Sequence, residues 1–377
     1  MTQGSETWLG VARELASEFR ERAATYDRED RFVAENYRRL RQRRLFSVLI
    51  PSELGGGGAD YDTVCEIVRR FGRGCGSTAL AYSMHLHPVA LNVFKYHRGQ
   101  PAEAMLRKVA GSELIIAGTG ANDGLGSSGS AEKVEGGYRV TGRKRFVSGC
   151  PEADVLVSSI RYEGGAEGPE VLHFSVPFSS AGVTIHDTWH AIGMRGTGSH
   201  DVELREVFVP DEAVVGRRPA DVWHPLWDAI LPTAMPIIMS AYLGIAEAAA
   251  DYARDHAPAR DEASPYLLAE MEQALTEAEL AWRDMVRIQD DYRYAPGLST
   301  TRAILVRKTL VARGANQAVE KAAETVGGRA FFQSSPLERE LRDVRAAHFH
   351  PFPDKRQQLF TGRLALGHDP VRGEPSA

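Results

Sequence analysis

Two histidines near the C-terminus are the residues whose type and spacing most directly suggest chemistry. His348 and His350 lie two residues apart in RDVRAAHFHPFPDK, residues 342–355. A residue before proline is pushed out of helical geometry, so His350, which precedes Pro351, is predicted to lie at a helix C-terminus. The helix dipole there favours positive charge and would raise the pKa of His350. Such a histidine can act as a general base on a phenol or an amine, or it can simply cap the last carbonyls of its helix.

A second histidine pair, His85 and His87, lies in the stretch YSMHLHP of the N-terminal region. No acidic residue joins either histidine pair at the spacing of metal ligands, so no metal site is predicted. Proton transfer is therefore the chemistry that these residues favour.

Composition excludes several classes of protein. The chain has 377 residues, a formal net charge of −5, 43% hydrophobic and 25% charged residues, which is ordinary for a globular protein and favours neither a nucleic-acid nor an anionic-membrane partner. The N-terminus lacks the plan of a signal peptide, and no stretch approaches the roughly eighteen apolar residues of a membrane span. Cys65, Cys75 and Cys150 are too scattered for a disulfide framework. We therefore expect a cytoplasmic protein with reduced thiols.

Helical periodicity dominates the first 110 or so residues. Apolar residues at helical spacing open the chain, and ENYRRLRQRRLFSVLIPSELGGGG predicts a helix that ends at Pro51, followed by a glycine loop at residues 55–58. The helical pattern returns over residues 61–97 and is broken around the glycines at positions 72, 74 and 76.

The period changes twice after that. From about residue 112, short runs rich in Val, Ile, Phe and Tyr alternate with turns, which indicates an antiparallel sheet. After about residue 222 the helical period resumes, with an apolar stripe from Ile304 to Val326 on one long helix that Gly327 and Gly328 would stop. The sequence thus predicts an α+β fold, mainly α, with domains at residues 1–111, 112–222 and 223–377.

Four motifs give this order a family resemblance. They are IPSELGGGGADY, TGRKRFVSG, GMRGTGSHDVELREVFVP and ETVGGRAFFQSSPLERELRDVRA. In this order and at these intervals they resemble the acyl-CoA dehydrogenase superfamily of flavoproteins over nearly the whole chain. The resemblance implies an N-terminal helical domain, a middle β-barrel, a C-terminal four-helix bundle, a bound flavin and usually a homotetramer.

The residues that serve as catalytic base in the family's dehydrogenases are missing. Aligning Arg342-Asp343 with the family's Arg-Asp pair puts Pro351 at one position of the catalytic glutamate, and the other position falls near Ala234, in a stretch without acids. The C-terminal segment is instead similar to two-component flavin monooxygenases of the superfamily, such as dibenzothiophene monooxygenase and the aromatic hydroxylases. His350 matches their histidine, and His348 replaces it if the alignment slips by two.

The resemblance also assigns site residues. Ser148 would contact flavin N5, and Phe146 would pack against the ring. A histidine beside the flavin is common in this branch, and His85 or His87 would supply it. The predicted catalytic residues are His350, Ser148, His348 and His85; the predicted cofactor-binding residues are Ser148, Phe146, Thr119, Gly120, Ala121, Asn122, Arg195, Thr197, Ser199, Gly327 and Gly328.

The cofactor is predicted to be FMN or FAD, with FMN favoured. The family's R…FG motif for the adenylate half of FAD is replaced here by ARDEASPYLLAEMEQAL. A flavin monooxygenase of this kind would use O₂, a small-molecule substrate and reduced flavin from a separate reductase. Its cleft would be lined by residues that suit a flat or apolar ligand: Met84, His85, Trp223, Trp227, Met235 and Met239.

Two alternatives stay open at this point. The chain could be an acyl-CoA or acyl-carrier dehydrogenase whose base has moved to Glu270, Glu272 or Asp228. It could also be a non-catalytic paralogue that binds no flavin.

Overall fold

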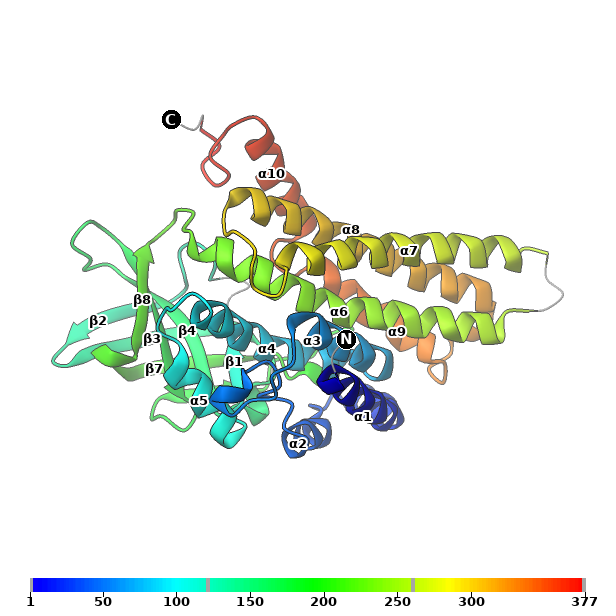
Figure 1. Cartoon of the computed structure of the whole chain (residues 1–377), viewed down its shortest axis with the longest axis horizontal. Coiled ribbons are helices and arrows are strands. Elements are labelled where there is room, and N and C mark those ends of the chain that lie inside the picture. The colour runs from blue at the N-terminus through cyan, green and yellow to red at the C-terminus, as the bar shows by residue number, and fades with distance from the viewer. Residues whose placement is uncertain (1–2, 120–122, 259–261, 375–377) are drawn as a thin grey trace.

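The computed structural model describes residues 3–119, 123–258 and 262–374. In sequence the strands lie between two helical segments, and in space the sheet lies at one end of a long helical bundle (Figure 1). The N-terminal helices are α1 (Gln3–Arg28), α2 (Ala34–Gln42), the 3-10 helix η1 (Ser52–Leu54), α3 (Tyr61–Gly74), α4 (Gly76–Tyr96) and α5 (Glu103–Ser112).

The break between α3 and α4 has a clear physical cause. The Asp60 carboxylate caps the start of α3 by accepting from the Thr63 N–H at 2.7 Å. A Cβ on Gly72 would lie 2.3 Å from the Ala241 carbonyl oxygen, and one on Gly74 would lie 2.3 Å from that of Ala16. These glycines therefore let α3 approach its neighbours closely, and the helix breaks at Cys75 as the sequence predicts.

The predicted helix end at Pro51 is wrong, because α2 already ends at Gln42. The apolar run that follows is buried as a series of turns. The Glu113 carboxylate holds this run by accepting from the Phe46 N–H at 3.0 Å and from the Ser47 hydroxyl. A tertiary contact from a distant residue thus replaces the continued helix.

The strands form one sheet in the order β6-β7-β3-β2-β4-β5-β8, with β1 paired to β4. Most pairs are antiparallel, but β1 and β2 each pair with β4 in parallel. Apolar residues of β3, β4, β5 and β7 point into one shared core, so the two halves of the sheet face each other. The strands are β1 (Ile116–Gly118), β2 (Ser130–Val134), β3 (Gly137–Val147), β4 (Val155–Tyr162), β5 (Glu170–Pro177), β6 (Val183–His186), β7 (His200–Pro210) and β8 (Val214–Pro219).

The C-terminal helices pack around α6. This helix contacts α3, α4, α7, α8 and α9. Helix α8 ends at Val326, before Gly327, as predicted, and Gly327 has a positive φ of 72°. The helices are α6 (Leu226–His256), α7 (Ser264–Gln289), α8 (Leu298–Val326), η5 (Gly327–Phe331), α9 (Pro336–Val344), η6 (Arg345–His348) and α10 (Asp354–Ala365).

The sequence expectation about membrane spans overlooked α6. By length and composition α6 is apolar enough to cross a membrane, and among the described helices it alone passes that test. However, 89% of its most apolar window is buried inside the protein, which is the packing of a core helix.

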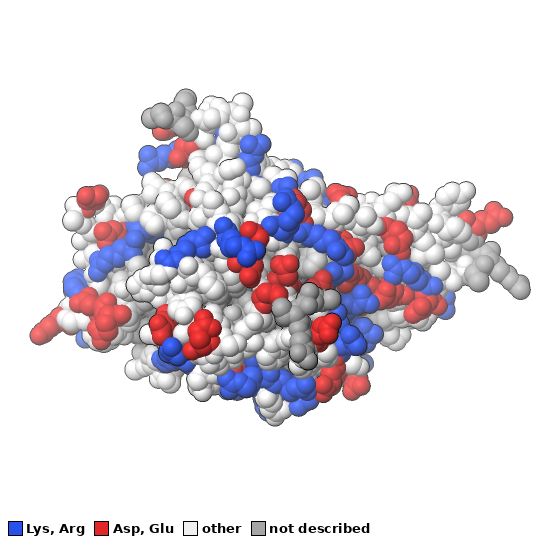
Figure 2. All heavy atoms as spheres, viewed as in Figure 1, with Lys and Arg blue, Asp and Glu red and all other residues white. Residues whose placement is uncertain are grey.

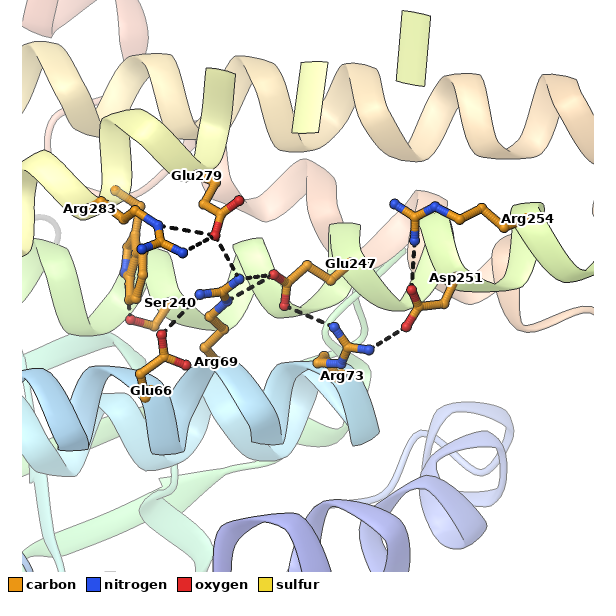
Figure 3. A network of polar contacts seen from close by, with 10 residues as sticks. Glu66, Arg69, Arg73, Ser240, Glu247, Asp251, Arg254, Glu279 and Arg283 are labelled. Carbon is orange, nitrogen blue, oxygen red and sulfur yellow. Dashed lines mark hydrogen bonds and ion pairs between the residues drawn. The ribbon is translucent and has the colours of Figure 1, made fainter. Parts of the chain in front are cut away.

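An ion-pair network joins α3 to the bundle (Figure 3). Arg69 of α3 contacts Glu247 of α6 and Glu279 of α7, and it also pairs with Glu66. Arg73 extends the network to Asp251. On the surface shown in Figure 2, positive and negative side chains are interspersed.

The predicted fold class is confirmed: an α+β, mainly α chain with a helical N-terminal part, a central β part and a C-terminal helical bundle. The domain limits at residues 111 and 222 stay a prediction.

Candidate active site

A cavity of about 910 Å³ lies between the N-terminal helices, the sheet and the first turns of α6. Helix α4 forms one wall, and strands β4, β5 and β8 form the other. Apolar side chains make up most of its surface, among them Leu91, Met105, Phe174, Trp227 and Ile230. A cavity of this size and character fits a small organic molecule.

His87 of α4 lines this cavity. His350 does not line it but lies close enough to His87 for the two rings to interact electrostatically. The ring Nε2 of His350 lies 2.5 Å from the hydroxyl of Tyr242 on α6. Burial lowers the pKa of His350 to about 3, with smaller effects from Lys308 and His87, and burial lowers that of His87 to about 4. Both rings are therefore neutral at neutral pH.

The predicted rise in the pKa of His350 is wrong. His350 lies beyond the end of η6, and it packs under α6 and α8 instead of ending a helix in solvent. Loss of hydration there outweighs any effect of a helix dipole.

His348 lies on the outer side of the same segment. Its Nδ1 is 3.2 Å from an Asp354 carboxylate oxygen. The buried ammonium of Lys308 donates to the Phe352 carbonyl at 3.2 Å and lies 3.8 Å from Asp354. These contacts anchor the segment that carries His350, and His348 does not line the cavity.

His85 was predicted to be the catalytic histidine of the pair, but the structure gives its ring a structural function. Its Nε2 donates to the Phe46 carbonyl at 2.8 Å, and its Nδ1 accepts from the Ile116 N–H at 3.0 Å. Both ring nitrogens are occupied by backbone groups, and the side chain is almost completely buried. Since His85 and His87 are two residues apart on a helix, only one of them can face the cavity.

Three hydroxyl groups form a chain at the end of β3. The Thr197 hydroxyl donates to the Met194 carbonyl at 2.9 Å, and the Ser199 hydroxyl lies 2.7 Å from both Thr197 and Ser148. Because the proton of Thr197 is committed to a carbonyl, Ser199 donates to Thr197 and Ser148 donates to Ser199. Ser148 is left as an acceptor toward any further ligand.

Phe146 lies beside this hydroxyl chain with 49% of its surface exposed. Its ring meets that of Trp189 edge-on, at a centroid distance of 5.7 Å. An exposed aromatic ring next to a polar acceptor suits a planar ligand with a polar edge.

The loop at residues 193–199 is held in place by close packing and by hydrogen bonds to α9. A Cβ on Gly193 would lie 2.4 Å from the Arg342 carbonyl oxygen, and one on Gly198 would lie 2.7 Å from Phe32. The carboxylate of Asp343, on α9, accepts from the Met194 N–H at 2.5 Å. Arg342 donates to Asp27 of α1 and to the Ile192 carbonyl. The Arg-Asp pair thus fixes the loop that carries Thr197 and Ser199.

Phe146, Ser148, Thr197 and Ser199 do not line the 910 Å³ cavity. The remaining predicted cofactor residues are spread more widely. Arg195 lies 3.3 Å from Asp30 through its Nε, and the Thr119 hydroxyl is 2.9 Å from that of Ser158, at the cavity. Gly120, Ala121 and Asn122 lie outside the described residues.

Gly327 and Gly328 are exposed at the opposite end of α6 from the cavity. The neighbouring Arg329 donates to the carbonyl of His256, the last residue of α6, whereas Trp227 in the first turn of α6 lines the cavity. Within one chain these two glycines are not brought to the cavity.

Of the six predicted cleft residues, Trp227 lines this cavity and the other five do not. Met235 and Met239 belong to the core and Met84 packs against it, His85 is buried, and Trp223 packs against Phe352 and Phe360. Among the lining residues that the sequence did not reveal are Lys95, His173 and His224. One signal for Lys95 was available, because it is the only charged residue in the sequence of α4.

Three domain models of one protein family match the three parts of the chain in order. The model of the acyl-CoA dehydrogenase N-terminal domain matches residues 5–113, that of the middle domain residues 117–207, and that of the C-terminal domain residues 237–355. The chain belongs to the acyl-CoA dehydrogenase family.

Relatives within the acyl-CoA dehydrogenase family differ in their names. YdbM of Bacillus subtilis (strain 168), provisionally named an acyl-CoA dehydrogenase, is 29% identical over 91% of this chain and 92% of its own length. Dibenzothiophene monooxygenase of Rhodococcus erythropolis is 31% identical over 71% of this chain, which spans 65% of that protein. KijD3, solved in complex with FMN and dTDP-3-amino-2,3,6-trideoxy-4-keto-3-methyl-D-glucose, is similar with a TM-score of 0.89 and 25% identity, over 99% of this chain and 96% of that chain.

No free carboxylate lines the described part of the cavity, although dehydrogenases of the acyl-CoA dehydrogenase family need one as base. Its acidic lining residues are Asp123 and Glu103. Asp123 forms a buried ion pair with Lys144 at 3.0 Å and accepts from Ser128, while Glu103 pairs with Arg107 at the surface.

The alternative acids also have partners. Asp228 accepts from Thr301 at 2.6 Å and from Trp223 at 3.3 Å. Glu270 pairs with Lys321 at 2.7 Å, and Glu272 pairs with Arg254 at 2.6 Å. None of the three lines the cavity.

Proposed function

We propose that this protein is a flavin-dependent monooxygenase that uses reduced flavin and O₂ to hydroxylate, or to S- or N-oxygenate, a small molecule. The observation that carries the proposal is the cavity itself. Every acidic side chain among its described lining residues is already paired, whereas a neutral histidine, His87, lines it and a second, His350, lies close by. Removal of a proton from carbon therefore lacks a carboxylate base.

The residues at the end of β3 fit a flavin. Phe146 offers an exposed aromatic face, and Ser148 offers an acceptor oxygen at the end of its hydroxyl chain. Reduced flavin carries an N–H at N5 that oxidised flavin lacks, so an acceptor favours the reduced form. When bound in that form, the flavin would supply the electrons that let O₂ transfer one oxygen atom.

His350 and His87 would interact with the proton-bearing group of the substrate. At neutral pH each ring has a lone pair on one nitrogen, and Tyr242 holds the orientation of the His350 ring through Nε2. Either neutral ring would accept a hydrogen bond from a phenol or an amine of the substrate and so orient it. Service as a general base, which commonly raises a rate by about 10²–10⁴, would require bound ligands to bring the pKa of the ring back toward neutrality. The walls of α4, β4 and β5 would orient the substrate and limit access of water.

Several finer points belong to this proposal. We favour FMN over FAD, since KijD3 was solved with FMN and the motif for the adenylate half of FAD is missing here. A separate reductase would supply the reduced flavin. We also propose a homotetramer in the cytoplasm. Gly327 and Gly328 would then take part in flavin binding only through a neighbouring copy.

A dehydrogenase is the second candidate, because YdbM carries that provisional name over a nearly full-length match. One titration separates the two functions. The purified chain is titrated anaerobically with oxidised and with reduced FMN and FAD, and the oxidised complexes are then mixed with acyl-CoAs of several lengths. A monooxygenase binds reduced FMN more tightly than oxidised FMN, and acyl-CoA leaves the flavin absorbance unchanged.

Two outcomes would contradict the proposal. Bleaching of the bound oxidised flavin by an acyl-CoA would identify a dehydrogenase. Absence of binding for all four flavins would identify a paralogue without flavin chemistry.

A further inference from the structure

We propose that the cavity binds the anionic head group of its ligand at Lys95, His173 and His224, and holds an apolar body against its other walls. The ligand class is an apolar molecule with one small oxyanion, such as a carboxylate, a sulfinate or a phosphate. That this ligand is the substrate rests on the proposed function, but the binding site itself does not.

Lys95 is the first feature that points to an anion. It lines the cavity from α4 and is half-buried, and burial lowers the pKa of its ammonium. Across the described residues, no carboxylate lies within ion-pair distance of it and no side-chain hydrogen bond reaches it. A lysine that is partly dehydrated without a counter-ion is costly unless a ligand supplies the negative charge.

Arg218 adds a second positive charge behind the same wall. Only 2% of its surface is exposed. Its guanidinium donates to the carbonyls of Leu125 at 2.5 Å and Gly124 at 2.9 Å, and to His173 Nε2 at 3.1 Å. These partners are neutral, so the charge of Arg218 is not cancelled by a paired carboxylate.

The acids near this wall are engaged elsewhere. Asp123 is paired with Lys144, Asp221 with Arg161 at 2.7 Å, and Glu170 with Arg217 at 3.5 Å. Asp123 and Asp221 do act on Arg218 at longer range, but each already has a cation of its own. The positive charges of Lys95 and Arg218 therefore remain in excess on this side of the cavity.

His173 and His224 add two ring N–H groups that can donate hydrogen bonds to an anion. His173 Nε2 accepts from Arg218 Nε–H, so the proton of the neutral ring is on Nδ1. His224 Nδ1 accepts from the Leu226 N–H at 3.2 Å, so its proton is on Nε2. Both residues line the cavity, and neither of these N–H groups has a hydrogen-bond partner among the described residues.

His173 also shows that these groups lie together. Lys95, His173 and His224 line the same cavity, and the pKa of His173 is lowered by burial and then by Arg218, His224 and Lys95, whereas Asp123 raises it. One ammonium and two ring N–H groups thus belong to the lining of one cavity. Charge-assisted hydrogen bonds from such donors are the stronger kind in proteins.

Calorimetric titration of the full chain, with and without reduced FMN, tests the proposal. The probes are 3-phenylpropionate, benzenesulfinate and phenyl phosphate, with the uncharged 3-phenylpropionamide as reference. We expect at least one anion to bind about tenfold more tightly than the amide, because a hydrogen bond to a charged group contributes roughly 1.5–3 kcal/mol. The three anions distinguish which oxyanion the site prefers.

Variants of one lysine make the result specific. Lys95→Met should remove the preference for the anion and leave amide binding unchanged. Lys95→Arg should keep most of the preference for the anion. Lys355→Met, at an exposed position on α10, is the matched control and should bind as the wild type does. Thermal melting checks that each variant is folded.

Equal binding of the anions and the amide would overturn the proposal, as would an unchanged preference in Lys95→Met or no binding by any probe. Anion binding by a chain that binds no flavin would contradict the monooxygenase proposal and leave this one standing.

Discussion

At the scale of single residues, the direction of a hydroxyl chain decides what the site prefers to bind. The Thr197 proton is committed to the Met194 carbonyl, and this orients Ser199 and then Ser148. Ser148 alone would donate or accept equally well by rotation. The chain removes that freedom and makes Ser148 an acceptor.

Substitution of Ser199 tests this orientation. In Ser199→Ala the Ser148 hydroxyl can rotate freely, so the wild-type preference for reduced over oxidised FMN should fall by about twofold to tenfold, the value of one ordinary hydrogen bond. The measurement is the ratio of the two dissociation constants, determined anaerobically. An unchanged ratio would show that the hydroxyl chain does not set the preference.

A buried histidine gives a second test at the residue scale. Burial lowers the pKa of His85 to about 4, whereas an unfolded histidine titrates near 6.5. Below pH 6.5 the unfolded state binds a proton at His85 that the folded state does not bind. The stability that the neutral ring contributes is therefore present above pH 6.5 and is lost as the pH falls toward 4. His85→Gln should therefore cost about 2 kcal/mol less at pH 5 than at pH 7, in urea unfolding.

His190→Gln is the control for that test. His190 is exposed, and its hydrogen bond to Asp30 raises its pKa. Its contribution should therefore fade as the pH rises, the opposite trend. The same cost for His85→Gln at both pH values would mean that the ring is not held neutral.

At the scale of elements, α9 fixes the loop at residues 193–199 to the rest of the fold. Asp343 accepts from the Met194 N–H, and Arg342 joins α1 to the same loop. Sequence comparison identifies this pair as a motif, but only the structure shows that it holds the loop in position.

Asp343→Ala should leave the Met194 N–H without its partner. Since an unsatisfied buried donor costs about 1–3 kcal/mol, we expect that loss in the free energy of unfolding, together with weaker FMN binding. Asp343→Asn keeps an acceptor oxygen and should lose less. Wild-type stability and FMN affinity in Asp343→Ala would contradict this function of α9.

At the scale of the whole molecule, ion pairs between α3, α6 and α7 join the N-terminal helices to the bundle (Figure 3). Arg69 is largely buried and contacts three carboxylates, whereas the side chain of Arg283 is 64% exposed. Removing one partner of a buried pair is far more costly than removing one at the surface.

Arg69→Met should therefore destabilise the protein by about 3–5 kcal/mol, because it leaves Glu247 as a buried charge with less compensation. Arg283→Met should cost no more than about 1 kcal/mol. Urea unfolding of both variants at neutral pH measures the difference. Similar costs for the two substitutions would show that the network does not join the domains.

The sequence was informative about elements and much less so about contacts. Helical and strand periodicity predicted the order of the elements, and the end of α8 at Gly327 was predicted from local chemistry. The end of α2 was not, because Glu113, far along the chain, fixes the turns that follow it.

The site shows the same limit. The motifs pointed to residues 146–148 and 195–199, but whether His85 or His87 faces the cavity depends on how α4 is rotated against the sheet. His173 and His224 are far apart in sequence, and only the fold brings both of them to the cavity. Lys308, which anchors the segment of His350, carried no sequence signal at all.

The central claim is that reduced flavin bound to this protein reacts with O₂. The most direct measurement is rapid mixing of the chain, loaded anaerobically with reduced FMN, with buffer that contains O₂. We predict a transient absorbance phase, distinct from both the reduced and the oxidised spectrum, before oxidised FMN appears. Reoxidation in a single step at the rate of free FMN, with stoichiometric release of hydrogen peroxide, would contradict the account.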